Sequence, residues 1–349
     1  EMERFLEATK EYTKMKIIFT LSYEADRCAD AIKKRGAAVV LGDTSRNATH
    51  LVHRMDFAKL MNMAEDGTKV GLTVLGPNMA WGREMLLWNA SKLMQTCTNS
   101  EEIVSMLTVN PAEFFGVSDR IGQLKAGLVQ RGIAGDRYQR RDRLSGLRKG
   151  GFANMLLLKN ATVYPQTEKA PFVGDVLCEN GRIKEIGKDL SADGAETIDL
   201  TGLNLLPGIV DCHSHAGLGP NGDTATLSYC TDTAHPVSPE MDVIYVADPT
   251  NGCYRWAIEN GITTLGILPG SSDVIDGTGF ATRTWGSNIF EMCLKRNICM
   301  KLSLGENPKG MFQNKNMEPD SRMGVTFILE EYFANAKAYM DKKDRGEKV

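Results

Sequence analysis

Histidine is scarce in this chain of 349 residues, which holds only five histidines and none after His235. The eight cysteines include no CxxC pair, which indicates reduced thiols in a cytoplasmic protein rather than a disulfide framework or a zinc knuckle. No apolar run approaches the ~20 residues of a membrane span. The formal net charge is only −3, so neither nucleic acid nor a membrane is an expected partner.

What is present is an alternation of helical and strand-like patterns. Residues 1–127 contain amphipathic helical segments, for example residues 25–36 and 57–67, that each lead into a short apolar run. Helices of this length between short strands predict parallel βαβ units. Gly36 is expected to end one helix, and Ser100 is expected to cap the start of a later one.

Two segments depart from that alternation. Residues 128–154 are rich in arginine and have almost no apolar periodicity. We expect a solvated basic linker there, and a basic patch for an anionic partner is the alternative. Residues 155–204 contain short strands joined by turns, and the pair Asn180-Gly181 predicts a hairpin because it supplies the positive φ of a tight turn. These residues are expected to form a small β-sandwich module.

The alternation returns in residues 205–349. A helix over residues 254–261 is expected to lead into a strand over residues 262–270. A second helix, over residues 290–297, is expected to lead into another strand, and a long helix ends the chain. The pattern as a whole predicts an α/β fold.

The segment LPGIVDCHSHAGL, residues 206–218, carries two histidines at the end of an apolar strand. His213 and His215 are two residues apart, so both side chains leave the strand on one face and can reach one metal ion. A lone histidine at a strand end is usually an ordinary polar residue, but this pair favours a metal site. Asp211 is expected to support the turn or to hold a ligand imidazole in the right tautomer.

Several motifs together resemble the amidohydrolase superfamily of metal-dependent hydrolases, and within it the branch related to imidazolonepropionase. The motifs are LLKNATVYP, GDVLCENGRIKEIG, LPGIVDCHSHAGL, ENGITTLGILPGS, MKLSLGENPKG and SRMGV. They span residues 155–325 almost without a break, which makes the resemblance more specific than one His-x-His motif.

The resemblance implies a (β/α)8 TIM-type barrel with a divalent metal, most often zinc, at the carboxyl ends of its strands. His213 and His215 would be the ligands from the first strand. A further ligand would come from the fourth strand, where Glu306 is favoured and Lys301, as a carbamate, is the alternative. His235 lies in the loop after the first strand, where contact with a substrate and plain loop polarity are equally expected.

The order of the family segments is unusual. Residues 1–127 resemble the back half of the fold, strands 6 to 8 with the closing helices, whereas residues 205–349 resemble strands 1 to 4. The chain is therefore expected to form an incomplete or permuted barrel. It is either a circular permutant or a fusion of tandem paralogous genes, with residues 128–154 as the seam. A homo- or hetero-oligomer that completes the barrel is a further expectation.

Several ligands of the family pattern are missing from the first half. Leu21 or Ser22 stands where the sixth strand should carry histidine. Gly76 or Pro77 stands where the eighth strand should carry the aspartate that acts as general base. Asp43, His50 and His53 follow another strand and are expected to be surface or cap residues rather than substitutes.

These observations predict a metal-dependent hydrolase that cleaves C–N bonds of cyclic amides or similar small molecules. The missing ligands predict impaired activity and leave the catalytic base unidentified. The alternative is a non-catalytic scaffold or regulatory subunit, or fused gene fragments without a function of their own.

Overall fold

The computed structural model of the protein describes residues 2–20, 25–42, 56–73, 85–95, 99–128, 155–167, 170–219 and 230–348. Several sequence predictions fall outside these residues. They are the ones that concern Leu21, Ser22, Asp43, His50, His53, Gly76, Pro77 and nearly all of the arginine-rich linker.

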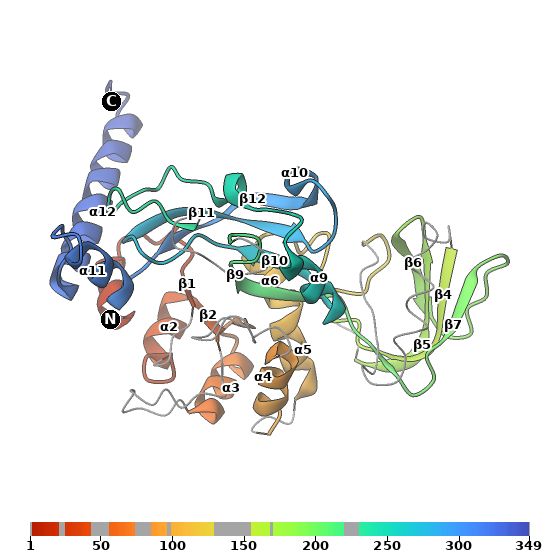
Figure 1. The fold of residues 1–349 in the computed structure, drawn as a ribbon. Coiled ribbons are helices and arrows are strands. Elements are labelled where there is room, and N and C mark those ends of the chain that lie inside the picture. The colour runs from red at the N-terminus through yellow and green to blue at the C-terminus, as the bar shows by residue number, and fades with distance from the viewer. Residues whose placement is uncertain are drawn as a thin grey trace.

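The first sheet confirms the parallel βαβ units that the sequence predicts for the first part of the chain. Its strands are β1 (Ile18–Thr20), β2 (Ala38–Leu41) and β3 (Val70–Leu72), parallel and in the order β1-β2-β3. The helices around it are α1 (Met2–Ala8), α2 (Ala29–Arg35), α3 (Phe57–Glu65), α4 (Met85–Leu93), α5 (Ser100–Leu107) and α6 (Val109–Phe114). Figure 1 shows α2 and α3 beside this sheet.

Local sequence decides where two of these helices begin and end. Gly36 ends α2 in the left-handed conformation, with φ of 66°, and its N–H is bonded back to the last turn, as predicted. The predicted cap at Ser100 is wrong, because Ser100 is the first residue of α5. Asn99 caps this helix instead, since its side-chain oxygen accepts hydrogen bonds from the backbone N–H groups of Glu101 and Glu102.

The second sheet contains β9 (Ile209–Ser214), β10 (Ile262–Ile267), β11 (Ile275–Arg283) and β12 (Cys293–Leu302) in the order β12-β11-β10-β9. β9 and β10 are parallel and are joined through α9 (Gly252–Glu259), as expected for a βαβ unit. β11 and β12 are antiparallel to their neighbours. The predicted helix over residues 290–297 is therefore mostly wrong: only α10 (Ile289–Met292) is helical.

The two sheets meet at β3 and β9. The Thr73 hydroxyl, just beyond β3, donates a hydrogen bond of 2.7 Å to the His213 carbonyl of β9. A Cβ atom built on Gly71 would lie 2.6 Å from the Cys212 sulfur, so β3 and β9 are packed backbone against side chain. The described strands do not close into a ring, and the TIM-type barrel and the permuted order stay predictions.

Residues 155–205 form a separate five-stranded sheet, which stands to one side of the other two sheets in Figure 1. Its strands are β4 (Met155–Val163), β5 (Phe172–Glu179), β6 (Arg182–Gly187), β7 (Glu196–Asp199) and β8 (Asn204–Leu205). Asn180 and Gly181 turn between β5 and β6 with φ of 51° and 72°, which confirms the predicted hairpin. Leu124, from the end of the first part of the chain, donates its N–H to the Pro165 carbonyl.

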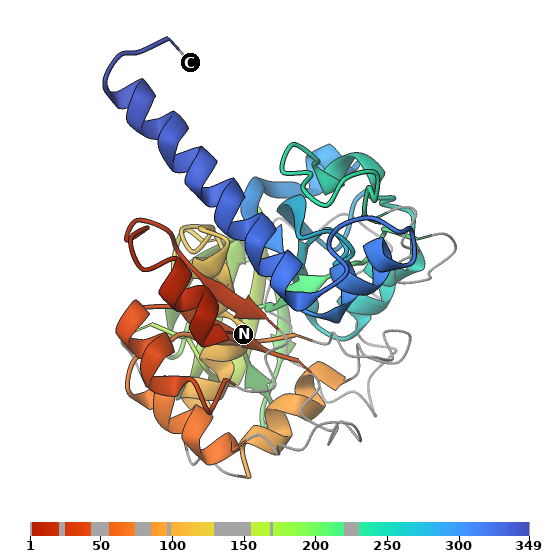
Figure 2. The same ribbon diagram turned by 90° about the vertical axis from the view of Figure 1, so that its left-hand side faces the viewer.

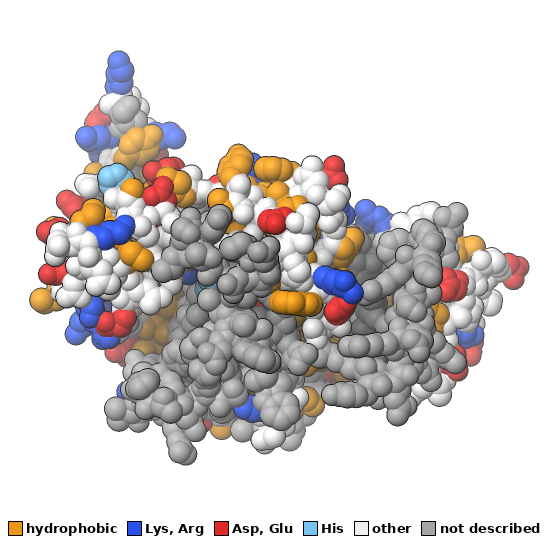
Figure 3. Space-filling view, viewed as in Figure 1, with side chains coloured by type: hydrophobic (Ala, Val, Ile, Leu, Met, Phe, Trp, Pro, Cys, Tyr) orange, Lys and Arg blue, Asp and Glu red, His pale blue; other side chains and the backbone are white. Residues whose placement is uncertain are grey.

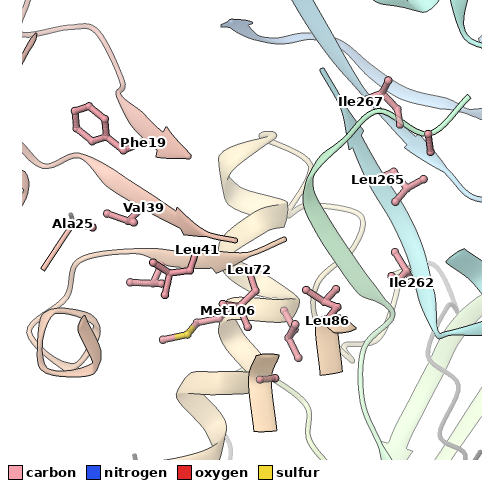
Figure 4. Packing of buried hydrophobic residues seen from close by; sticks show 14 of the residues in the cluster. Phe19, Ala25, Val39, Leu41, Leu72, Leu86, Met106, Ile262, Leu265 and Ile267 are labelled. Carbon is pink, nitrogen blue, oxygen red and sulfur yellow. The ribbon is translucent and has the colours of Figure 1, made fainter. Parts of the chain in front are cut away.

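One hydrophobic core links the two main sheets. It includes Phe19, Val39, Leu41 and Leu72 from the first sheet and Ile262, Leu265 and Ile267 from β10 (Figure 4). Both parts of the chain therefore bury apolar surface against a common interior, which is the main source of their stability.

The chain ends in two helices, α11 (Glu306–Gln313) and the 23-residue α12 (Arg322–Asp344). Figure 2 shows α12 crossing the molecule and projecting beyond it. It contacts the turn that follows α1, since Lys337 pairs with Glu11 at 2.9 Å and the ring centroids of Phe333 and Tyr12 are 5.6 Å apart. Among the described helices, none is long and apolar enough to cross a membrane.

Apolar side chains also gather on the surface over α10 and η4 (Val243–Val246), as Figure 3 shows. Tyr245 and Phe290 are more than half exposed, and their ring centroids are 5.9 Å apart. Arg296 stacks on Tyr245 and pairs with Asp242, so this patch is ordered by its own contacts.

Candidate metal centre

His213 in β9 and His215, one residue beyond the strand, lie next to each other at its carboxyl end. The ring centroids of His213 and His215 are 5.1 Å apart, with the ring planes at 85°. His213 is buried and His215 is half-buried. The spacing of two residues along a strand thus puts both imidazoles on one face, at the end where Leu268 follows the parallel neighbour β10.

The tautomer of His215 follows from its partner. Its Nδ1 lies 2.8 Å from the Leu268 carbonyl oxygen, which can only accept a hydrogen bond. Nδ1 must therefore carry the proton in the neutral ring, and Nε2 carries a free electron pair. Burial, and then the nearby Lys301, lower the pKa of His215 to about 4, so the ring is neutral at pH 7.

His213 is held by two threonines from the other sheet. Its Nδ1 is 2.7 Å from the Thr20 hydroxyl oxygen at the end of β1, and its backbone carbonyl accepts from Thr73. Burial, then the positive charge of Lys301, hold the pKa of His213 well below its usual value. Its Nε2 is buried and has no hydrogen-bond partner. A buried polar atom without a partner costs about 1–3 kcal/mol, a penalty that a bound cation would remove.

Lys301 is the third residue of this group. It lies near the end of β12, is only 8% exposed, and is close enough to both imidazoles to lower their pKa values. Its amino group donates a 3.4 Å hydrogen bond to the Gly270 carbonyl. Burial lowers the pKa of Lys301, and Asp276 opposes that effect. A desolvated lysine gives up its proton more readily than an exposed one, which is the state that carboxylation requires.

Glu306, the favoured ligand from the sequence, does not join this group. It is the first residue of α11, its side chain is 55% exposed, and it accepts a 2.7 Å hydrogen bond from Arg322. Among the described residues, no three His, Cys, Asp or Glu side chains come together as a metal site. β12 ends at Leu302, and Glu306 begins a surface helix with its carboxylate paired to Arg322, so its role as a metal ligand stays a prediction.

His235 is exposed in the segment between Cys230 and η4. Its backbone carbonyl accepts a hydrogen bond of 3.5 Å from the Ser238 hydroxyl. Asp211 is buried, and its carboxylate accepts from the backbone N–H of His213, so it braces the strand end as expected. The role of His235 toward a substrate stays a prediction.

The sequence does not predict two buried acids, Asp273 and Asp276, as site residues, although Asp276 lies close enough to Lys301 to raise its pKa. Asp276, the second residue of β11, accepts hydrogen bonds from the Ser303 hydroxyl and from the backbone N–H of Asp273, both at 2.8 Å. Burial raises its pKa to about 6, against the opposing effect of Lys301. Asp273 is fully buried, and burial together with Asp276 raises its pKa to about 7, against the opposing effect of Ser238. Both acids follow β10 at the end of the sheet that carries the site, and this position is the sequence feature that points to them.

Asp273 should make the stability of the protein depend on pH. Between about pH 4 and pH 7 the unfolded carboxyl group is ionised while the folded one keeps its proton, so stability falls as pH rises through this window. Asp273→Asn removes the ionisation. Between pH 5 and pH 8 the unfolding free energy of the wild type, measured by urea titration, should therefore fall by roughly 1–3 kcal/mol relative to that of the variant. An equal difference at both pH values would contradict this expectation.

Comparison with known proteins relates the chain to named enzymes, although no family model matches it. It is 28% identical over 192 residues to the amidohydrolase tasK of Hapsidospora irregularis, which covers 50% of this chain and 19% of that protein. It is 30% identical over 155 residues to the dihydroorotase of Aquifex aeolicus, 44% of this chain and 30% of that one. A shorter match, 40% identical over 70 residues, is to the D-hydantoinase of Geobacillus stearothermophilus.

A solved structure is also similar. The amidohydrolase from Thermotoga maritima MSB8 is 33% identical, superposes with a TM-score of 0.50, and matches 56% of this chain and 51% of that chain. The matches thus span about half of that structure and less than a third of the tasK and Aquifex proteins. The α/β fold, the paired histidines at a strand end and these similarities together identify the chain as a relative of the amidohydrolase superfamily of hydrolases.

Proposed function

We propose that the chain is a metal-dependent hydrolase that cleaves C–N bonds of cyclic amides, with His213, His215 and Lys301 as the residues that hold the metal. One observation carries the proposal. One buried and one half-buried imidazole, both uncharged at pH 7, lie beside a buried lysine, and the Nε2 atom of His213 has no partner. Histidine nitrogen and carboxylate oxygen are among the ligands that zinc accepts in catalytic sites.

Lys301 can contribute an oxygen ligand only after carboxylation. The neutral amine adds to carbon dioxide, a C–N bond forms, and one proton leaves to solvent or to a neighbouring group. The burial that lowers the pKa of Lys301 favours the neutral amine that this reaction needs. The same burial protects the carbamate from water, and the Gly270 carbonyl keeps the side chain in place.

The protein groups around the site have separate tasks. The Leu268 carbonyl orients His215, and Asp211 braces the backbone N–H of His213. When bound, the metal would polarise the substrate carbonyl and lower the pKa of a water molecule toward 7. Burial of His213 limits the access of other water to that side of the site and strengthens electrostatic interactions there.

Two related proposals concern substrate and assembly. A cyclic amide is proposed because relatives over part of the chain are named dihydroorotase and D-hydantoinase. We also propose that the two main sheets are parts of one TIM-type barrel in permuted order. The contact of β3 with β9 supports this, since a barrel joins its last strand to its first.

The alternative is a non-catalytic relative that keeps the fold. The sequence favours it at the position of the general base, where Gly76 or Pro77 stands in place of an acid.

Zinc content distinguishes the two. Protein purified with zinc and bicarbonate and then dialysed should retain about one zinc per chain by elemental analysis, as a site with several protein ligands does. It should also hydrolyse at least one member of a panel of five- and six-membered cyclic amides. The matched control is the double variant His213→Asn, His215→Asn, which should lose both properties. Zinc-free wild-type protein without activity would support the non-catalytic alternative.

A further inference from the structure

Thr20, in the first part of the chain, bonds to an imidazole ring of the metal centre. This threonine ends β1, is half-buried, and lies 193 positions before His213 in the sequence. Its hydroxyl oxygen is 2.7 Å from the Nδ1 atom of His213. Thr73 also bonds to His213, but at the backbone carbonyl, whereas Thr20 bonds to the imidazole ring.

We propose that Thr20 is a positioning residue that fixes the tautomer of His213. The use of this tautomer for metal binding rests on the proposed function, whereas the tautomer itself can be measured without it. In this arrangement the Nδ1–H of His213 donates to the Thr20 hydroxyl oxygen, and Nε2 keeps its electron pair for a cation. Thr20 then does for His213 what the Leu268 carbonyl does for His215.

The surroundings of the ring favour this direction of the hydrogen bond. A hydroxyl can donate or accept, so the distance alone does not decide it. With the opposite tautomer, Nε2–H would be a buried donor without an acceptor, which native proteins avoid more strictly than an unused acceptor. Lys301 also lies close enough to act on His213 electrostatically, and its N–H groups repel another donor but not an electron pair.

The arrangement has a consequence for the assembly of the site. A ring nitrogen can bind a metal only when the other nitrogen carries the proton, and the partner of that proton sets the choice. Here the ligand belongs to β9 and the partner that sets its tautomer belongs to β1. The centre is therefore complete only when residues from both parts of the chain are folded together.

The tautomer can be measured in metal-free protein labelled with nitrogen-15 in histidine. Long-range proton–nitrogen NMR spectra separate the two tautomers, and the spectrum of His213→Asn assigns the His213 signals. Wild-type protein at pH 8 should show His213 protonated at Nδ1. A His213 ring protonated at Nε2 in the wild type would overturn the proposal, whatever the variants do.

Three variants separate positioning of the ring from general loosening. Thr20→Val keeps the shape but removes the acceptor, so His213 should lose its single Nδ1–H tautomer, whereas Thr20→Ser should keep it. Thr73→Val removes the bond to the backbone of the same histidine and is expected to leave the tautomer unchanged. If Thr20→Val and Thr73→Val change the His213 signals in the same way, the change comes from general loosening of the site and not from loss of the Thr20 hydroxyl, and the proposal fails.

Zinc affinity gives a second readout, from competition with a chromophoric chelator. Thr20→Val should weaken zinc binding by about 10- to 100-fold, the usual effect of losing the partner of a ligand histidine, and Thr20→Ser should restore it. Equal affinities for Thr20→Val and the wild type would contradict the inference. If the wild type binds no zinc, the proposed hydrolase fails, while the tautomer measurement still decides the role of Thr20.

Discussion

Gly71→Val is expected to destabilise both parts of the described chain together, by about 3 kcal/mol. A Cβ at this position would lie 2.6 Å from the Cys212 sulfur of β9 and 2.9 Å from the Phe114 ring. Cys212 is buried, and the dense packing of a protein interior leaves a buried side chain little room to move. Valine adds two further methyl groups to that contact, and β3 must separate from β9 to make room for them.

The measurement is urea unfolding, combined with hydrogen exchange to locate the effect. Amides of β2 and of β10 should lose protection together, because residues on both strands belong to one hydrophobic core. Gly310→Ala is the matched control, since its Cβ would meet nothing within 4 Å and it lies inside α11. Loss of protection in the first sheet alone would mean that the two parts fold independently and that the contact of β3 with β9 is weak.

Local patterns were sufficient for much of the fold. The parallel strands β1 and β2 were predicted from short apolar runs that follow amphipathic helices, and Asn180-Gly181 predicted a hairpin from two residues. Residues 290–297 gave the wrong answer, although their helical spacing is real. From Cys293 onward they pair with β11 instead, where Ala281 faces Lys295 and Thr282 faces Cys293. Tertiary pairing overrides a weak local preference, and the sequence alone does not show the partner strand.

The candidate site, like the fold, is only partly predictable from the sequence. His213 and His215 were found because their spacing makes them neighbours on any strand. Choosing between Glu306 and Lys301 requires knowing where β12 ends, and the ends of strands and helices are the least reliable part of sequence prediction. Thr20 could not be found, since its hydrogen bond joins residues that lie in different sheets and far apart in the chain.

Lys301→Met is expected to weaken zinc binding by more than about 100-fold, since a lost ligand costs more than a lost partner of a ligand. Methionine has nearly the length of lysine and suits a site that is only 8% exposed, so the fold should persist. His213 and His215 remain in this variant, and two histidines alone hold zinc poorly. Zinc binding, measured by chelator competition, should therefore fall while the far-ultraviolet circular dichroism spectrum stays unchanged.

Carbon dioxide separates a carboxylated lysine from any other role of Lys301. Zinc loading of the wild type should drop when metal-free protein is prepared and loaded without carbon dioxide and bicarbonate, because the oxygen ligand then cannot form. Lys301→Glu supplies a carboxylate directly, so its zinc loading should be weaker than that of the wild type but independent of bicarbonate. Glu306→Gln is the control, because its exposed side chain is already paired with Arg322. Normal zinc binding by Lys301→Met, or its loss in Glu306→Gln, would move the third ligand from β12 to the start of α11.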